Sequence, residues 1–202
     1  MLIDNSLNIQ RIQALTDAVF AVAMTLLILE VRLPAGFDTV VLKDYFLTTT
    51  AIELFVYAIG FITLGIFWIG SHFHHHHIKK TDRVSSWLNI LFLMFICVIP
   101  FSIGFINKYK YAQEAIIFFC TNLIFITLVN VLMLLYAWKK QYIKEHFTKA
   151  HFRNTIHRTM IPAYCYVLII LISFMSTSFV LYLFLVPVLL HLIPEAGNKN
   201  ID

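Results

Sequence analysis

One carboxylate lies inside an apolar stretch near the start of the chain. Asp17 follows Thr16 in the segment 11–30, whose middle is almost wholly apolar and long enough for a membrane-spanning helix. An ionisable side chain at membrane depth is costly unless it is paired or meets water, so such residues are usually functional. Asp17 is therefore either held by a donor on another helix or in contact with a moving ion, and the sequence leaves both interpretations open.

A stripe of branched side chains follows this carboxylate along the same predicted helix. Because an α-helix advances about 100° per residue, residues at i, i+4 and i+7 share one narrow face. Here these residues are Val22, Leu26 and Leu29. Thr25 lies at the edge of this face, whereas Thr16 and Asp17 point away from it. The face contacts lipid or a neighbouring helix, or it lines a pore that its branched side chains close by excluding water.

A tryptophan and several histidines end a second apolar segment. Trp68 and His72 are one turn apart and share a helix face. Their ring N–H groups could therefore both reach the carboxylate of Asp17 and the hydroxyl of Thr16.

The histidines within 72–77 allow three interpretations. His72 and His76 have the i, i+4 spacing of a metal-binding pair, but no cysteine or well-placed carboxylate completes a tetrahedral set, Asp82 being the only nearby acid. Protonation below pH about 6.5 would add positive charge at a cytosolic mouth. A solvated basic helix end is the ordinary interpretation. We predict no specific metal site.

The composition is that of a polytopic membrane protein. Hydrophobic residues make up 60% of the chain, charged residues 13%, and the mean hydropathy is +0.81. Soluble domains are about half apolar and about a quarter charged. No small-residue cleavage site follows the first apolar segment, so we expect no removable signal peptide. The cysteines Cys97, Cys120 and Cys165 have neither metal-site nor redox-pair spacing and are expected to be inert packing residues.

Six apolar segments predict an all-α integral membrane protein with six transmembrane helices in a single domain over residues 1–202. Each has about the 20 residues that a bilayer requires, except the sixth, which is short. Their approximate limits are 10–33, 45–72, 85–106, 111–138, 155–175 and 179–193. The short connection between the last two predicts a tight helical hairpin. In the third segment, Asn89 is expected to seek a partner helix.

The basic residues predict the orientation in the membrane. Most lysines and arginines flank the N-terminus, the loops after the second and fourth segments, and the C-terminus, which places both termini in the cytosol. Arg11, at the cytosolic end of the first segment, is expected to reach the headgroups. At the opposite end, Glu30 either pairs with Arg32 or adds negative potential that attracts cations to an outer mouth.

Three motifs together resemble the prokaryotic branch of the transmembrane protein 175 family, whose relatives are lysosomal potassium channels. They are Arg11 followed by Leu15, Thr16 and Asp17; Phe67 and Trp68 before a histidine; and Trp87, Leu88 and Asn89 leading to Pro100 and Phe101. The family's first motif usually reads Arg-x-x-x-Phe-Ser-Asp. Thr16 keeps the hydroxyl of the serine, whereas Leu15 lacks the phenylalanine ring. The resemblance is strong in the first three segments and extends to the others in layout only.

The resemblance implies a homotetramer of six-helix subunits, with the first helices around a central cation pathway and without a potassium-channel filter loop. It implies an apolar pore constriction at Val22, Leu26 and Leu29 and a selectivity ring of hydroxyls at Thr25. It also implies that a further set of residues locks the first helix to its neighbours from behind. This set is Arg11, Thr16, Asp17, Trp68 and His72.

Together these features predict a potassium-permeable, weakly selective cation channel of the bacterial plasma membrane. Its permeant ions would be K⁺ and other monovalent cations, its partners identical subunits and the lipid bilayer, with no cofactor, nucleic acid or enzymatic activity. A secondary transporter, metal- or proton-coupled, is the alternative, although the repeats and broken helices common in such proteins are not evident. An intramembrane enzyme would need paired catalytic groups, and Asp17 with His72 is the only candidate pair.

Overall fold

The computed structural model describes residues 9–31, 45–109, 112–144, 148–177 and 179–192. In these ranges the chain is helical apart from its loops and one isolated β-bridge between Ile78 and Ile143. The helices are α1 (Ile9–Leu26), α3 (Ala51–His77), α4 (Arg83–Lys108), α5 (Gln113–Lys139), α6 (Lys149–Ser173), α7 (Val180–Leu183) and α8 (Leu185–Leu192). The 3₁₀ turn η1 (Leu27–Glu30) extends α1, and the π-helical turn η2 (Phe46–Thr50) precedes α3.

Five helices of the described ranges are long and apolar enough to cross a membrane, namely α1 with η1, α3, α4, α5 and α6. This confirms the prediction of an all-α, multi-pass membrane protein. The sixth predicted segment is divided into α7 and α8, which form a shorter apolar stretch, Val180–His191. At about 1.5 Å per residue this stretch is about 18 Å long, against a hydrocarbon core of about 30 Å. A sixth complete crossing stays a prediction.

The fifth predicted segment begins earlier than expected. α6 starts at Lys149, whereas the prediction placed its start near residue 155. The Thr148 hydroxyl caps the helix by accepting a hydrogen bond from the His151 main-chain N–H at 3.3 Å. The prediction followed apolar residues only, so it missed the polar first turns of this helix. α6 packs against both α7 and α8, as expected for a hairpin.

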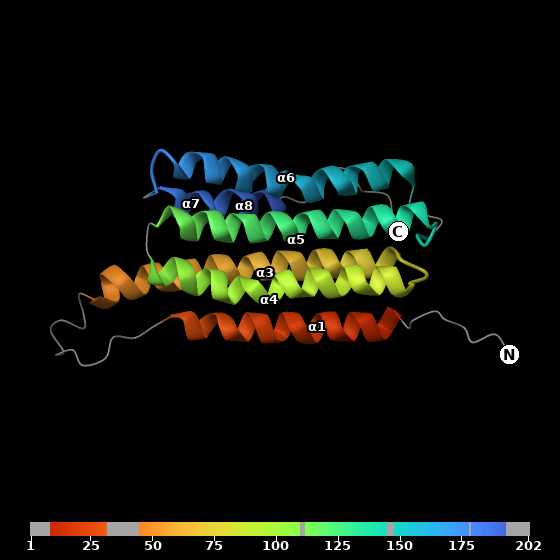
Figure 1. The fold of residues 1–202 in the computed structure, drawn as a ribbon, viewed down its shortest axis with the longest axis horizontal. Coiled ribbons are helices and arrows are strands. Elements are labelled where there is room, and N and C mark those ends of the chain that lie inside the picture. The colour runs from red at the N-terminus through yellow and green to blue at the C-terminus, as the bar shows by residue number, and fades with distance from the viewer. Residues whose placement is uncertain (1–8, 32–44, 110–111, 145–147, 178, 193–202) are drawn as a thin grey trace.

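The long helices lie side by side in an elongated bundle, with α1 at one edge (Figure 1). α4 packs extensively on α5, and α5 on α6, so that the largest buried side chains come mostly from α4 and α5. They include Phe92, Ile96, Phe119 and Leu123. α1 packs mainly against α3 and α4. Because its neighbours lie on one side, the other side of α1 is open in the single chain.

Two loops are tied together at the end of the bundle where α3 finishes. The Lys79 N–H donates to the Tyr142 carbonyl at 2.7 Å, and the Lys144 N–H donates to the His77 carbonyl at 3.0 Å. These main-chain bonds flank the β-bridge and join the α3–α4 loop to the segment that follows α5. The start of the α3–α4 loop is therefore held against the segment that follows α5.

Gly60 on α3 allows three helices to meet closely. A Cβ at this position would lie 3.0 Å from Ile103 Cδ1 on α4 and 3.5 Å from Leu27 Cδ2 at the end of α1. Both neighbours are completely buried, so they have little room to move. A small residue at such a crossing lets helix backbones approach each other in a membrane.

We expect Gly60→Ala to destabilise the bundle by about 1–3 kcal/mol, the usual effect of overpacking a core. Gly65→Ala on the same helix is the matched control, because a Cβ there would meet no atom within 4 Å. Thermal unfolding of the two variants in detergent measures the difference. Equal melting temperatures would contradict the close crossing at Gly60.

Candidate functional site

α1 packs on the bundle through one face. Its buried residues recur at i, i+4, i+7 and i+11, and they are Thr16, Phe20, Ala23 and Leu27. The Phe20 ring contacts the ring of Phe92 on α4, with 6.0 Å between centroids. This periodicity is that of a helix buried on one side. It fixes the rotation of α1 about its own axis.

The opposite face of α1 carries the predicted pore stripe. The exposed fractions of Val22, Leu26 and Leu29 are 56%, 44% and 69%. Leu29 belongs to the 3₁₀ turn η1, where side chains at i and i+3 eclipse, so it stands nearly above Leu26. A regular α-helix, from which the stripe was predicted, would not contain this turn. An exposed row of large apolar side chains marks a face that contacts something outside the single chain.

Thr25 is exposed beside this stripe. Its hydroxyl donates a hydrogen bond to the Val22 carbonyl at 2.8 Å. The hydroxyl proton is thus engaged within the helix, and the oxygen keeps lone pairs that can accept from water or contact a cation.

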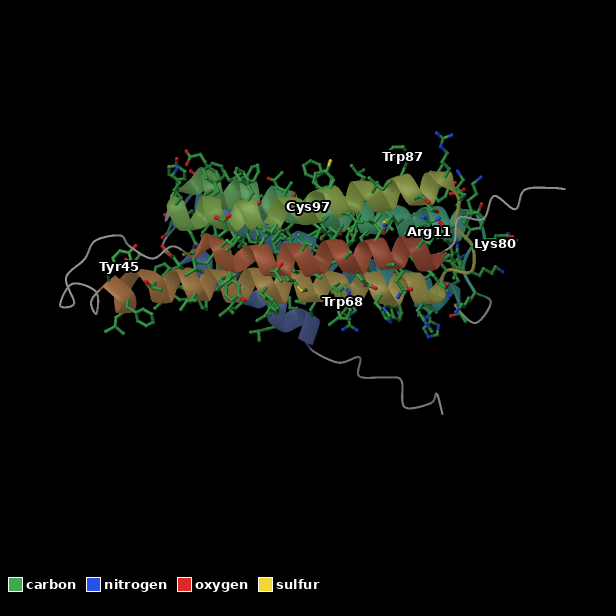
Figure 2. The ribbon with its side chains drawn as sticks, turned by 90° about the horizontal axis from the view of Figure 1, so that it is seen from below. Arg11, Tyr45, Trp68, Lys80, Trp87 and Cys97 are labelled. Carbon is green, nitrogen blue, oxygen red and sulfur yellow. The ribbon has the colours of Figure 1, made fainter. Side chains whose placement is uncertain are left out.

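Asp17 and Trp68 meet between α1 and α3. The indole N–H of Trp68 donates to Asp17 Oδ1 at 2.9 Å. A hydrogen bond to an ionised group contributes about 1.5–3 kcal/mol, which offsets part of the cost of a carboxylate at membrane depth. Figure 2 shows Trp68 on α3, the helix that lies beside α1 in this view.

His72 bonds to a different residue from the one expected. Its Nδ1 lies 3.3 Å from Gln13 Nε2, whereas the residue spacing suggested that the imidazole could reach Asp17 and Thr16. α1 and α3 run in opposite directions (Figure 1), so the residue one turn after Trp68 faces the residue one turn before Asp17. The Gln13–His72 contact therefore forms a second rung next to the Asp17–Trp68 bond.

Thr16 and Asn89 form a buried polar pair between α1 and α4. The Thr16 hydroxyl donates to the Ile12 carbonyl at 2.9 Å and accepts from Asn89 Nδ2 at 3.1 Å. Both side chains are almost completely buried. Asn89 does find a partner helix, as expected, but its partner Thr16 was not predicted.

Arg11, in contrast, is exposed, and within the described ranges it forms no hydrogen bond or ion pair.

Glu30 ends the same helix at the other end of the bundle. Its carbonyl accepts a hydrogen bond from Asn107 Nδ2 at 3.2 Å. Its carboxylate lies against Gly104 on α4, where a Cβ would collide with it. This contact has no signal in the sequence, because a glycine's role in close packing depends on the neighbouring helix. The predicted partner Arg32 lies outside the described residues.

The described histidines at the end of α3 do not share one environment. His74 is buried, whereas His72 and His76 are exposed. The His77 ring lies against the ring of Phe73 in a tilted arrangement with 4.2 Å between centroids, and its Nδ1 lies 2.8 Å from the Phe73 carbonyl. Among the residues that the structure describes, no group of three or more His, Cys, Asp or Glu is placed to hold a metal ion. Sensing of pH by this cluster stays a prediction.

Comparison with known proteins confirms the family resemblance. Residues 11–100 match the family described as the endosomal/lysosomal potassium channel TMEM175. A potassium channel of Streptomyces collinus is 30% identical over 105 residues, 52% of this chain and 50% of that protein. The endosomal/lysosomal proton channel TMEM175 of Homo sapiens is 31% identical over 101 residues, 46% of this chain and 20% of that protein. The chain spans about half the length of the curated bacterial relatives it matches.

A solved structure shares the fold over most of the chain. The crystal structure of a lysosomal potassium-selective channel TMEM175 homolog from Chamaesiphon minutus superposes with a TM-score of 0.74. The match covers 91% of this chain and 95% of that chain at 20% sequence identity. It therefore extends the shared fold beyond the region in which the sequences match the family.

We expect Trp68→Phe to lower stability by about 1.5–3 kcal/mol, because it removes the charge-assisted donor of Asp17 while keeping an aromatic ring. Trp87→Phe is the matched control, since that indole is 60% exposed and makes no hydrogen bond to another described residue. Melting temperatures in detergent give the comparison. A loss of stability no larger at Trp68 than at Trp87 would argue against an anchoring role for the Asp17 bond.

Proposed function

We propose that this chain, a relative of the TMEM175 channels, forms a potassium-permeable, weakly selective cation channel whose pathway is lined by α1. The observation that carries the proposal is the exposed stripe of Val22, Leu26 and Leu29 on a helix whose other face is packed. The family match over residues 11–100 includes this stripe, and several bacterial relatives are named potassium channels.

The channel is a homotetramer of one-domain, six-crossing subunits, in which α7 and α8 together supply the sixth crossing. A single chain offers one stripe, which can form only one wall of a pathway. Copies of the chain related by a closed rotation bring the same face of α1 toward one axis, as in most symmetric oligomers. That arrangement covers the exposed apolar side chains of α1 with their counterparts from other subunits.

Conduction is limited by the apolar constriction at Val22, Leu26 and Leu29. Rings of branched side chains gate a pore by dewetting, because a narrow apolar passage does not hold the water that accompanies an ion. The 3₁₀ turn supports this role by placing Leu29 on the same face as Leu26, about 6 Å further along the helix, so that both leucines can contribute a ring around the axis. A pore closed in this way needs no charged side chain that moves to block it.

Selectivity comes from the Thr25 ring at the same level. Its hydroxyl oxygens can replace part of the hydration shell of a K⁺ ion, since their protons are engaged with the Val22 carbonyls. Single hydroxyls give fewer and weaker ligands than the stacked carbonyl rings of a potassium-channel filter. The Thr25 ring therefore discriminates only weakly between monovalent cations.

A polar lock holds α1 in place from behind. The contacts that support it are the Asp17–Trp68 bond, the Gln13–His72 contact and the Thr16–Asn89 pair. Arg11 belongs to this set through the family motif and through its place at the cytosolic end of the helix. Asp17 acts in this arrangement as an anchor of α1, with its charge held by the indole N–H and away from the ion pathway.

The channel lies in the bacterial plasma membrane with both termini in the cytosol. This orientation rests on the excess of basic residues at one end of the bundle. In membrane proteins the loops that are richer in lysine and arginine face the cytosol. Glu30 then lies near the outer mouth and adds negative potential that attracts cations. The transporter alternative has no observation in its favour beyond the histidines.

We expect Leu26→Asn and Leu29→Asn each to increase K⁺ flux into liposomes, because an amide ring wets the constriction. Leu168→Asn is the matched control, since this leucine is similarly exposed but lies on α6. Fluxes of K⁺, Na⁺ and H⁺ measured in parallel should show K⁺ favoured over Na⁺. If neither variant changed the flux, the constriction would be assigned to the wrong residues. Saturable uptake driven by a proton gradient would instead support a transporter.

A further inference from the structure

Exposed basic side chains gather at the end of the bundle where α3 ends and α4 begins. Figure 2 shows Arg11, Lys80 and Trp87 at this end. The exposed basic residues nearest the α3–α4 loop are Lys79, Lys80 and Arg83. Within the described ranges none of the three forms an ion pair. No described acid therefore neutralises these three charges.

The acid nearest to them in the sequence, Asp82, is already engaged. Asp82 accepts hydrogen bonds from the Ser85 main-chain N–H at 2.9 Å, from the Tyr136 hydroxyl at 2.6 Å and from the Tyr142 hydroxyl at 3.3 Å. Partial burial raises the pKa of this carboxyl, but the hydrogen bonds outweigh it and leave the pKa below its usual value. Asp82 is thus an ionised helix cap whose oxygens point to Ser85 and the tyrosines.

Arg83 begins an exposed face of α4 that changes from basic to apolar. Trp87 lies one turn further along and is 60% exposed. The next exposed side chains on this face follow Trp87 at i+3, i+4 and i+7, and they are Ile90, Leu91 and Met94. A guanidinium, an indole and an apolar row therefore succeed one another along one side of a membrane helix.

We propose that this surface, made of Lys79, Lys80, Arg83 and Trp87, binds the headgroup of an anionic phospholipid. The Arg83 guanidinium offers paired N–H donors that match a phosphate, and the two lysines add attraction for a negative headgroup. The Trp87 indole occupies the interface between headgroup and acyl chain, where tryptophan is enriched. The apolar row below it contacts the acyl chain.

The apolar row favours a lipid over a soluble phosphate. A free phosphate or a nucleic acid would use the basic residues but would make no complementary contact with Trp87, Ile90 and Met94. A phospholipid matches both parts of the surface in the order in which α4 presents them. The main-chain bond from Lys79 to Tyr142 holds the basic loop at the end of this face.

The test uses the full chain, reconstituted into vesicles of mixed phosphatidylcholine and phosphatidylglycerol and then extracted into mild detergent. The phospholipid that stays bound is quantified by mass spectrometry. We expect retention of phosphatidylglycerol over phosphatidylcholine. In Lys79→Gln/Lys80→Gln/Arg83→Gln this preference should fall by on the order of 100-fold, since each of these three basic residues, gathered at one headgroup, contributes about fivefold.

Two comparisons make the result specific. Lys108→Gln removes an exposed charge at the other end of α4 and should leave the preference unchanged. Excess glycerol phosphate should not displace the bound phosphatidylglycerol. Unchanged preference in the triple variant, an equal loss in Lys108→Gln, or displacement by glycerol phosphate would each overturn the proposal. If the triple variant is not monodisperse, Lys80→Gln alone should lower the preference by about fivefold, and no change there would also overturn it.

Discussion

The charge of Asp17 within an apolar helix constrains how α1 can dock. A carboxylate without a donor is unstable in hydrocarbon, so α1 must lie where a donor reaches it, and the Trp68 indole does so at 2.9 Å. This bond sets the depth of α1 against α3. Together with the packed face that contains Phe20 and Leu27, it also sets the rotation of α1. With α1 docked in this way, Val22, Leu26 and Leu29 lie on its exposed side, opposite the packed face.

The contacts of α1 divide it into two halves with different chemistry. Toward its N-terminus, polar rungs join it to α3 and α4, because the antiparallel helices bring Gln13 to His72 and Asp17 to Trp68. Toward its C-terminus, the packing is mainly apolar and depends on the close crossing at Gly60, and a hydrogen bond from Asn107 to the Glu30 carbonyl ends it. In our account the polar half anchors the helix and the apolar half carries the constriction. A charged residue in the ion pathway is then unnecessary.

Periodicity and hydropathy predicted the features that each helix has by itself, namely its length and its apolar and polar faces. The five long apolar helices and the opposite placement of Thr16 and Leu26 on α1 follow from residue spacing alone. Contacts between helices were harder to predict, since the Gln13–His72 rung depends on helix direction and register. The contact of Glu30 with Gly104 depends on backbone proximity, which has no sequence signal. The start of α6 was missed because its first turns are polar and capped by a threonine.

The central claim is that the exposed faces of α1 from several subunits meet at one axis, and disulfide cross-linking in membranes tests it most directly. Cys97 and Cys165 would be replaced by serine, while the buried Cys120 can stay. On mild oxidation, Leu29→Cys should form covalent dimers, whereas Leu168→Cys on α6, with a similar exposure, should stay monomeric. A monomeric Leu29→Cys, or equal cross-linking at Leu168, would contradict the account.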